Sequence, residues 1–215
     1  NAVPRRYGDL GSWHLLFSTR LDGTSLAHML SSVEKAGPCV LLLRDAESQL
    51  FGAYSTELRN AGASFYGAGE SFLFAMSSIV LPPPPRLQAT PPPAARRTPS
   101  RKLAPRPALA TWVFPWSRLN EYFVRSDADS LTFGAGGSAG LVLKEDVRCG
   151  ISGRSETYLN LPLPLVARLG EAAFEDDLTG SPAELESAFC CDVLEVWGVD
   201  EMACRTLCVE YDECS

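Results

Sequence analysis

The chain has 215 residues, of which 46% are hydrophobic and 21% charged, a composition typical of a soluble globular protein with one core. Six of its 19 basic residues and none of its 26 acidic residues lie at positions 82–109, so the other positions carry 13 basic against 26 acidic groups, a net charge of −13. An acidic folded part excludes nucleic acid as a partner. No apolar run approaches the length of about 18 residues that a membrane-spanning helix needs, so we expect no membrane insertion and a cytoplasmic segment of a longer protein.

The first part of the chain alternates between apolar runs and turn signals. Residues 13–18 predict a strand, and residues 25–36 predict an amphipathic helix with Thr24 or Ser25 as its N-cap. The apolar positions of that helix fall at i, i+3, i+4 and i+7: Leu26, Met29, Leu30 and Val33. Residues 40–43 and 50–54 are two apolar runs joined by a polar segment, which predicts a β-hairpin.

Residues 65–74 have an unusual composition, with two glycines and one glutamate between aromatic residues: Phe-Tyr-Gly-Ala-Gly-Glu-Ser-Phe-Leu-Phe. Gly67 and Gly69 lack a Cβ and can adopt positive φ, so we expect a sharp turn there, followed by a strand at 71–76. Further short strands are expected at residues 111–116, 121–125, 131–133 and 141–143. Short strands at this density predict an antiparallel β-sandwich or meander decorated by helices, α+β in class but mainly β.

Residues 82–109 hold ten of the 16 prolines and almost no large apolar side chains, so burial cannot offset the entropy of ordering them. We expect a disordered insertion there, which is either a tolerated surface loop or a Pro/Arg-rich ligand for an SH3-type or acidic partner. A second loop expansion is expected at 161–188, with a short helix starting at 181–184, where Ser, Pro and Glu occupy the N-cap, N1 and N3 positions. A late strand at 189–199 and a final helix at 201–209 complete a single domain over residues 1–215.

The seven cysteines are an odd number, and Cys39 and Cys191 lie inside apolar runs, so no disulfide framework is expected. Three further cysteines, at positions 204, 208 and 214, lack the two-plus-two spacing of a zinc site, and the only histidines, His14 and His28, are far upstream. We expect reduced thiols, no metal and no cofactor, with zinc binding and reversible oxidation as the alternatives.

A glycine-rich segment at residues 134–140, Gly-Ala-Gly-Gly-Ser-Ala-Gly, could surround an anion with its backbone N–H groups. A phosphate site of this kind needs a helix to begin at the loop, whereas Leu141-Val-Leu predicts another strand, so we expect a glycine-rich hairpin or bulge. No Gly-x-Ser-x-Gly motif is present for nucleophilic catalysis. The candidates for that chemistry are Ser18, Ser71, Ser138 or Cys39 as nucleophile, with His14 or His28 as base.

Two carboxylates, Glu70 and Asp129, occupy junctions next to glycines or strand ends. A carboxylate in such a place can accept several backbone N–H bonds and stabilise a turn. We expect that structural role, with a functional role as the alternative.

Residues 65–74 resemble the signature of the TLDc domain. The likeness continues in five other segments: Trp13-His-Leu-Leu-Phe-Ser-Thr-Arg-Leu-Asp-Gly-Thr-Ser-Leu, Val40-Leu-Leu-Leu-Arg-Asp, Leu50-Phe-Gly-Ala-Tyr, Asp129-Ser-Leu-Thr-Phe-Gly-Ala-Gly-Gly and Leu194-Glu-Val-Trp. Together these segments cover roughly residues 12–199.

The resemblance implies a two-sheet antiparallel β-sandwich with flanking helices, as in eukaryotic oxidation-resistance proteins. It also implies a non-catalytic interaction domain that supports resistance to oxidative stress and binds the cytosolic sector of the vacuolar proton-pumping ATPase (V-ATPase). The domain would then be cytoplasmic and would reach organelle membranes only through the pump. The candidates for partner binding in the matching motifs are Gly67, Gly69, Glu70, Asp129 and Gly134. The alternative is a hydrolase or antioxidant enzyme that uses a Cys or Ser with His14 or Glu70.

Overall fold

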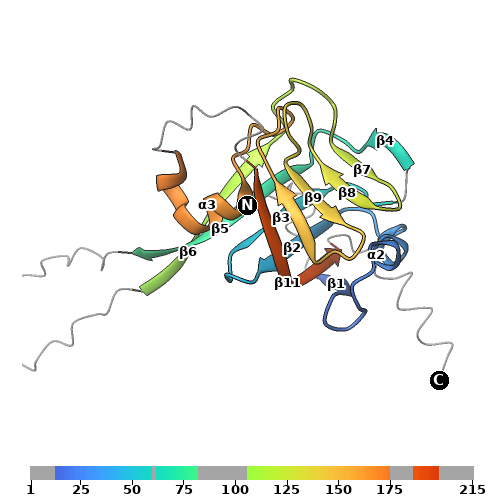
Figure 1. Ribbon diagram of the computed structural model, residues 1–215, viewed down its shortest axis with the longest axis horizontal. Coiled ribbons are helices and arrows are strands. Elements are labelled where there is room, and N and C mark those ends of the chain that lie inside the picture. The colour runs from blue at the N-terminus through green and yellow to red at the C-terminus, as the bar shows by residue number, and fades with distance from the viewer. Residues whose placement is uncertain (1–12, 60–61, 82–105, 175–185, 199–215) are drawn as a thin grey trace, which may run out of the picture.

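The computed structural model of the chain describes residues 13–59, 62–81, 106–174 and 186–198. Its strands form two antiparallel sheets that share one long strand, β11 (Ser187–Gly198), as Figure 1 shows. The first four residues of β11 pair with β10 in one sheet, and the part from Cys191 onward pairs with β2 in the other. The predicted fold, a mainly antiparallel two-sheet β-sandwich with helices, is confirmed. The sequence did not reveal that one strand would join the two sheets.

The strand order of the first sheet is β1-β11-β2-β3-β5-β6, and that of the second is β4-β7-β8-β9-β10-β11. The first sheet contains β1 (His14–Ser18), β2 (Cys39–Asp45), β3 (Leu50–Ser55), β5 (Phe72–Leu81) and β6 (Arg106–Pro115). The second contains β4 (Gly62–Tyr66), β7 (Val124–Ser126), β8 (Ser130–Phe133), β9 (Leu141–Lys144) and β10 (Cys149–Ser152).

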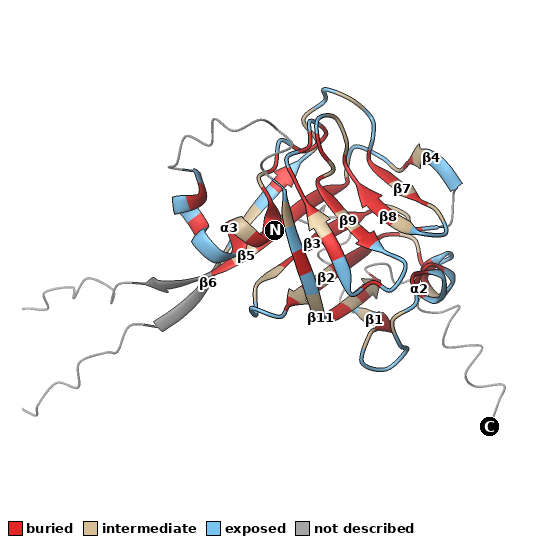
Figure 2. Cartoon of the chain, viewed as in Figure 1, coloured by how far each residue is buried: buried red, intermediate tan, exposed pale blue. Residues whose placement is uncertain are grey.

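The core lies between the two sheets and is covered at its margin by helix α2 (Leu26–Val33) (Figure 2). All four apolar residues predicted to face the core from this helix are buried. The backbone N–H of His28 donates to the Ser25 hydroxyl at 3.3 Å, which confirms Ser25 as the N-cap. The helix ends at Val33 and not at residue 36. A tighter turn follows Val33, in which the Ala36 N–H donates to the Val33 carbonyl.

The end of the predicted disordered insertion is a strand. Residues 106–109 belong to β6, because β5 continues to Leu81 and pairs there with Arg106. Pro107 is tolerated in this position because β6 is an edge strand, so the missing N–H costs no bond to a second neighbour. The rest of the insertion, residues 82–105, lies outside the described residues.

The second predicted loop expansion, 161–188, is largely helical where the structure describes it. It contains α3 (Leu163–Leu169) and the 3₁₀ helix η1 (Gly170–Phe174), and it ends in the start of β11. Pro162 and Pro164 are compatible with α3, because a proline at the N-cap or in the first turn costs no helical hydrogen bond. The helices predicted at 181–184 and 201–209 lie outside the described residues.

Two strands of the second sheet differ from the prediction. The strand expected at 121–125 is mostly loop, and β7 occupies Val124–Ser126 instead. Its partner β4 was not predicted, because residues 62–64 are exposed and carry no apolar alternation. None of the helices in the described ranges is long and apolar enough to cross a membrane.

Candidate functional site

The first part of the candidate site is the glycine-rich turn at residues 67–71. Gly67 has φ +101°, in the left-handed region that favours glycine, and the Ser71 N–H closes the turn on the Ala68 carbonyl at 3.0 Å. Gly69 does not have positive φ, so that part of the prediction was wrong. Gly69 is needed for a different reason: a Cβ there would lie 2.7 Å from Cζ3 of Trp116 and closer still to its Cε3. The Trp116 indole therefore packs directly on the Gly69 backbone.

Trp116 fixes the loop between β6 and β7 to this turn. Its Nε1 donates to the Asn120 carbonyl at 2.7 Å, and its ring packs edge-on against Phe123, with the ring centroids 5.3 Å apart. Phe123 in turn contacts both glycine motifs. A Cβ added at Gly67 would lie 3.3 Å from the Cβ of Phe123. The Phe123 carbonyl accepts the N–H of Gly134 at 3.0 Å.

A network of polar groups, centred on the buried Thr157, joins this loop to two others. The Thr157 hydroxyl donates to Oδ1 of Asn120 at 2.7 Å and accepts the N–H of Ala135 at 3.0 Å. The Ser117 hydroxyl donates to the Glu156 carbonyl at 2.6 Å. Thr157 is fully buried, so its hydroxyl depends on partners within the protein, and the carbonyls of Ala135 and Tyr122 lie within 3.1 and 3.4 Å of it as well. The β6–β7 loop, the β8–β9 loop and residues 155–160 thus form one rigid unit at one end of the sandwich, which we call the loop cluster (Figure 1).

The β8–β9 loop is a glycine-rich hairpin, as predicted, because strand β9 and not a helix follows it. Gly134 has φ +72°, and a Cβ there would lie 2.8 Å from both the Ser155 hydroxyl and Cδ2 of Tyr158. Three N–H groups of the loop are already bonded within the protein: those of Gly134, Ala135 and Ser138 donate to Phe123, Thr157 and Arg154. These bonds disfavour a phosphate site in the loop, because the three N–H groups are not available to an anion.

Residues 155–160 hold their own shape through side-chain hydrogen bonds. The Ser155 hydroxyl donates to Oδ1 of Asn160 at 2.7 Å, and Nδ2 of Asn160 donates to the Gly153 and Leu161 carbonyls at 2.7 and 3.0 Å. The Tyr158 hydroxyl donates to the Phe123 carbonyl at 3.3 Å, and burial raises the pKa of this phenol above its ordinary range. These polar side chains hold the segment in place without presenting reactive groups to solvent.

The two candidate carboxylates lie apart. Glu70 is half-buried near the end of the 67–71 turn, which packs through Gly69 against Trp116 of the loop cluster. Asp129 is exposed in the turn before β8, at the opposite end of that strand from Gly134. The structure therefore brings Gly67, Gly69, Glu70 and Gly134 to one end of the sandwich and leaves Asp129 at the other.

The residue that stabilises the turn before β8 is Asp127, which the sequence reading missed. Its Oδ1 accepts the backbone N–H groups of Asp129 and Ser130 at 3.0 and 2.8 Å. Burial raises the pKa of the Asp127 carboxyl, but these bonds, the Ser130 hydroxyl and nearby Arg125 outweigh that effect and leave the pKa below its ordinary value. The carboxylate that accepts these N–H bonds is therefore Asp127, whereas the sequence had suggested Asp129 for such a role.

The rim of the loop cluster exposes large apolar side chains. Leu119, Tyr122 and Leu159 are 63%, 47% and 57% exposed. The Tyr122 ring rests against Phe65, with centroids 4.9 Å apart, so it is held in place at the surface. Rigidly held, exposed apolar side chains are typical of protein-binding surfaces.

The described contacts do not assemble a histidine-activated nucleophile. His28 lies within hydrogen-bonding distance of the Asp22 carbonyl, with its Nδ1 at 3.1 Å, and His14 Nε2 is buried without a hydrogen-bond partner. Burial raises the pKa of the Cys39 thiol to about 12, which disfavours the nucleophilic thiolate. In residues 13–59, 62–81, 106–174 and 186–198, no group of three or more His, Cys, Asp or Glu side chains could hold a metal ion.

Comparison with known proteins agrees with the sequence motifs. Residues 2–86 match the family description "TLDc domain". The chain is 35% identical over 183 residues to oxidation resistance protein 1 of Gibberella zeae, an alignment that covers 75% of this chain and 56% of that protein. It is 34% identical over 178 residues to the Podospora anserina protein of the same name, covering 76% of this chain and 51% of the relative.

A third relative, nuclear receptor coactivator 7 of Mus musculus, is 32% identical over 150 residues, which are 69% of this chain and 13% of that protein. The chain spans about half the length of the two fungal relatives. The motif at residues 65–74, the family match and these relatives agree, and the chain belongs to the TLDc domain family.

Proposed function

We propose that this chain is a non-catalytic interaction domain that supports resistance to oxidative stress by binding the cytosolic sector of the V-ATPase. Family membership and relatives named for oxidation resistance support the link to oxidative stress. The pump as partner follows from the resemblance to TLDc domains. A cytoplasmic position, next to organelle membranes only through the pump, belongs to the same proposal.

The observation that carries the proposal is the architecture of the loop cluster. Partly buried hydrogen bonds link three loops to one another, and their rim exposes Leu119, Tyr122 and Leu159. A pre-organised surface loses little conformational entropy on binding, so its exposed apolar side chains can contribute most of their burial energy to affinity. We infer that this rim is the surface that contacts the pump.

The test compares two charged substitutions on the rim with one elsewhere. Leu119→Asp and Leu159→Asp place a carboxylate in the proposed contact, where burial of the charge is unfavourable. Leu21→Asp is the matched control, because Leu21 is 76% exposed and lies in the turn after β1. Each variant is used to capture the cytosolic sector from detergent-free cytosol, and each is expressed in cells that lack the endogenous protein and then exposed to peroxide.

We expect Leu119→Asp and Leu159→Asp to reduce capture of the sector at least tenfold, about 1.4 kcal/mol, and to reduce survival in parallel. The Leu21→Asp variant should behave as the parent does. Equal capture by all three variants would place the contact elsewhere. Peroxide or ester turnover by the isolated chain, without any partner, would favour the enzyme alternative.

A further inference from the structure

Two cysteines face each other across neighbouring strands of the second sheet. Cys149 of β10 and Cys190 of β11 are directly paired residues in the antiparallel register. The Cys191 N–H donates to the Arg148 carbonyl at 2.6 Å, so the neighbouring pair of residues is hydrogen-bonded. Because the two kinds of pair alternate along an antiparallel ladder, Cys149 and Cys190 form a non-hydrogen-bonded pair. Side chains of such a pair project from the same face of the sheet, and the Cα atoms lie about 4.5 Å apart. A disulfide accepts Cα separations of about 4.4–6.8 Å, so this pair can be bridged without moving the strands far.

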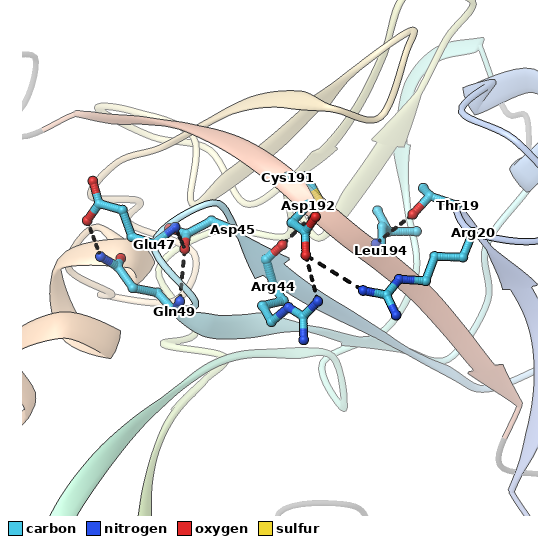
Figure 3. A network of polar contacts seen from close by, with 9 residues as sticks. All are labelled: Thr19, Arg20, Arg44, Asp45, Glu47, Gln49, Cys191, Asp192 and Leu194. Atoms are coloured by element: carbon cyan, nitrogen blue, oxygen red, sulfur yellow. Dashed lines mark hydrogen bonds and ion pairs between the residues drawn. The ribbon is translucent and has the colours of Figure 1, made fainter.

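Cys149 and Cys190 are more exposed to solvent than the other described cysteines. Cys149 and Cys190 are both exposed and both free, whereas Cys39 is fully buried. Cys191 is half-buried, and its thiol lies 3.7 Å from the Arg44 carbonyl (Figure 3). Burial, with the charges of Asp192 and Asp45, raises the pKa of the Cys191 thiol to about 12. Adjacent cysteines in one strand therefore have opposite environments.

The backbone around the pair is held firmly. Phe189 packs its ring against Phe51 on the core side, with centroids 5.0 Å apart, and it fills the space that a side chain at Gly150 would need. On the other side of the pair, the register of β11 shifts between Cys191 and Val193, as at a β-bulge. The Asp192 carboxylate at this shift accepts a hydrogen bond from Arg44 at 2.6 Å and lies 3.8 Å from Arg20 (Figure 3). These contacts keep Cys190 opposite Cys149 where β11 passes from one sheet to the other.

We propose that Cys149 and Cys190 form a peroxide-oxidisable dithiol that closes reversibly to a cross-strand disulfide. One thiolate attacks hydrogen peroxide, the O–O bond breaks, and a sulfenic acid forms with release of water. The second thiolate attacks the sulfenic sulfur, the S–S bond forms, and the departing hydroxide takes a proton to become water. Two thiols and one peroxide thus give one disulfide and two waters, and the two electrons pass from the sulfurs to the peroxide.

The bridge would be easy to reduce again. It would be solvent-exposed and would join directly opposed residues of neighbouring strands, and exposed or strained disulfides are the ones that a thiol reductant opens readily. It would tie β10 covalently to β11 at the point where the two sheets meet. This redox pair goes beyond the proposed pump binding and does not depend on it.

The test uses the full chain with Cys204, Cys208 and Cys214 replaced by Ser, which leaves Cys39, Cys149, Cys190 and Cys191. The protein is treated with hydrogen peroxide, free thiols are blocked with N-ethylmaleimide, and the intact mass gives the number of blocked thiols. Trypsin then releases residues 149–154 and 169–205, so the linked peptides can be identified. Three variants are compared in this background: Cys149→Ser, Cys190→Ser and the neighbouring control Cys191→Ser.

We expect peroxide to remove two thiols per chain, to link peptide 149–154 to peptide 169–205, and to be fully reversed by dithiothreitol. Cys149→Ser and Cys190→Ser should each abolish the intramolecular bridge, and Cys191→Ser should retain it. Thermal melts of all three variants check that each is folded. A bridge that survives Cys149→Ser, a bridge lost in folded Cys191→Ser, linkage between two chains, or no loss of thiols would overturn the proposal.

Discussion

Replacing Gly69 by alanine tests the packing on which the loop cluster rests. Gly69 has ordinary backbone geometry, so alanine adds no backbone strain, and the effect must come from the Trp116 indole. A Cβ at this position would lie 2.7 Å from Cζ3, whereas ordinary contacts begin at 3.4 Å, so the ring must move by at least about 0.7 Å. Overpacking of this kind costs about 1–3 kcal/mol.

The same movement weakens a second interaction. The Trp116 Nε1 bond to the Asn120 carbonyl is 2.7 Å long, and its loss adds about 1 kcal/mol. We therefore expect Gly69→Ala to lower the free energy of unfolding by about 2–4 kcal/mol, measured by urea denaturation. A double-mutant cycle isolates the cause, since in a Trp116→Ala background the same substitution should cost only a few tenths of a kcal/mol. An equal cost in both backgrounds, or no cost in the parent, would refute the packing argument.

Two other substitutions test separate parts of the fold. Asp127→Ala should destabilise the domain by about 1 kcal/mol at neutral pH, because the Asp129 and Ser130 N–H groups lose their acceptor. The pKa of Asp127 is lowered by folding, so its stabilisation is complete above the unfolded value of about 3.9 and is lost as the pH falls through the folded pKa. Urea midpoints of parent and variant should therefore converge in acid, and a constant difference down to low pH would contradict the assignment. Replacing residues 82–105 by a short Gly/Ser hairpin loop should leave the melting temperature within a few degrees, because Leu81 and Arg106 are already paired; aggregation of the product would show that the segment is structural.

Local patterns in the sequence predicted much of the fold. Helix α2 was identified from four apolar residues at helical spacing and a capping serine, and all of these occupy the expected positions. The hairpin of β2 and β3 followed from two apolar runs around a polar segment. The glycine loop after β8 was correctly read as a hairpin because a strand-like run follows it. In each case the information lies within a few neighbouring residues.

The loop cluster depends on contacts that no local pattern contains. Gly69 meets Trp116, and Asn120 meets Thr157, which lies 37 residues away along the chain. A polar residue between two apolar ones, as Asn160 is between Leu159 and Leu161, is a signal for buried hydrogen bonding, but the sequence does not identify its partners. The pairing of Cys149 with Cys190 likewise depends on the register of β10 and β11. A one-residue shift would place the two thiols on opposite faces.

Association of the purified components tests whether this domain acts by binding. The chain is titrated into the purified cytosolic sector of the pump, and complex formation is followed by light scattering after size-exclusion chromatography. We predict a saturable complex that needs no third component, is lost with Leu119→Asp and persists with Leu21→Asp. Failure of the pure components to associate, or catalytic consumption of peroxide by the isolated chain, would show that the domain does not act by binding.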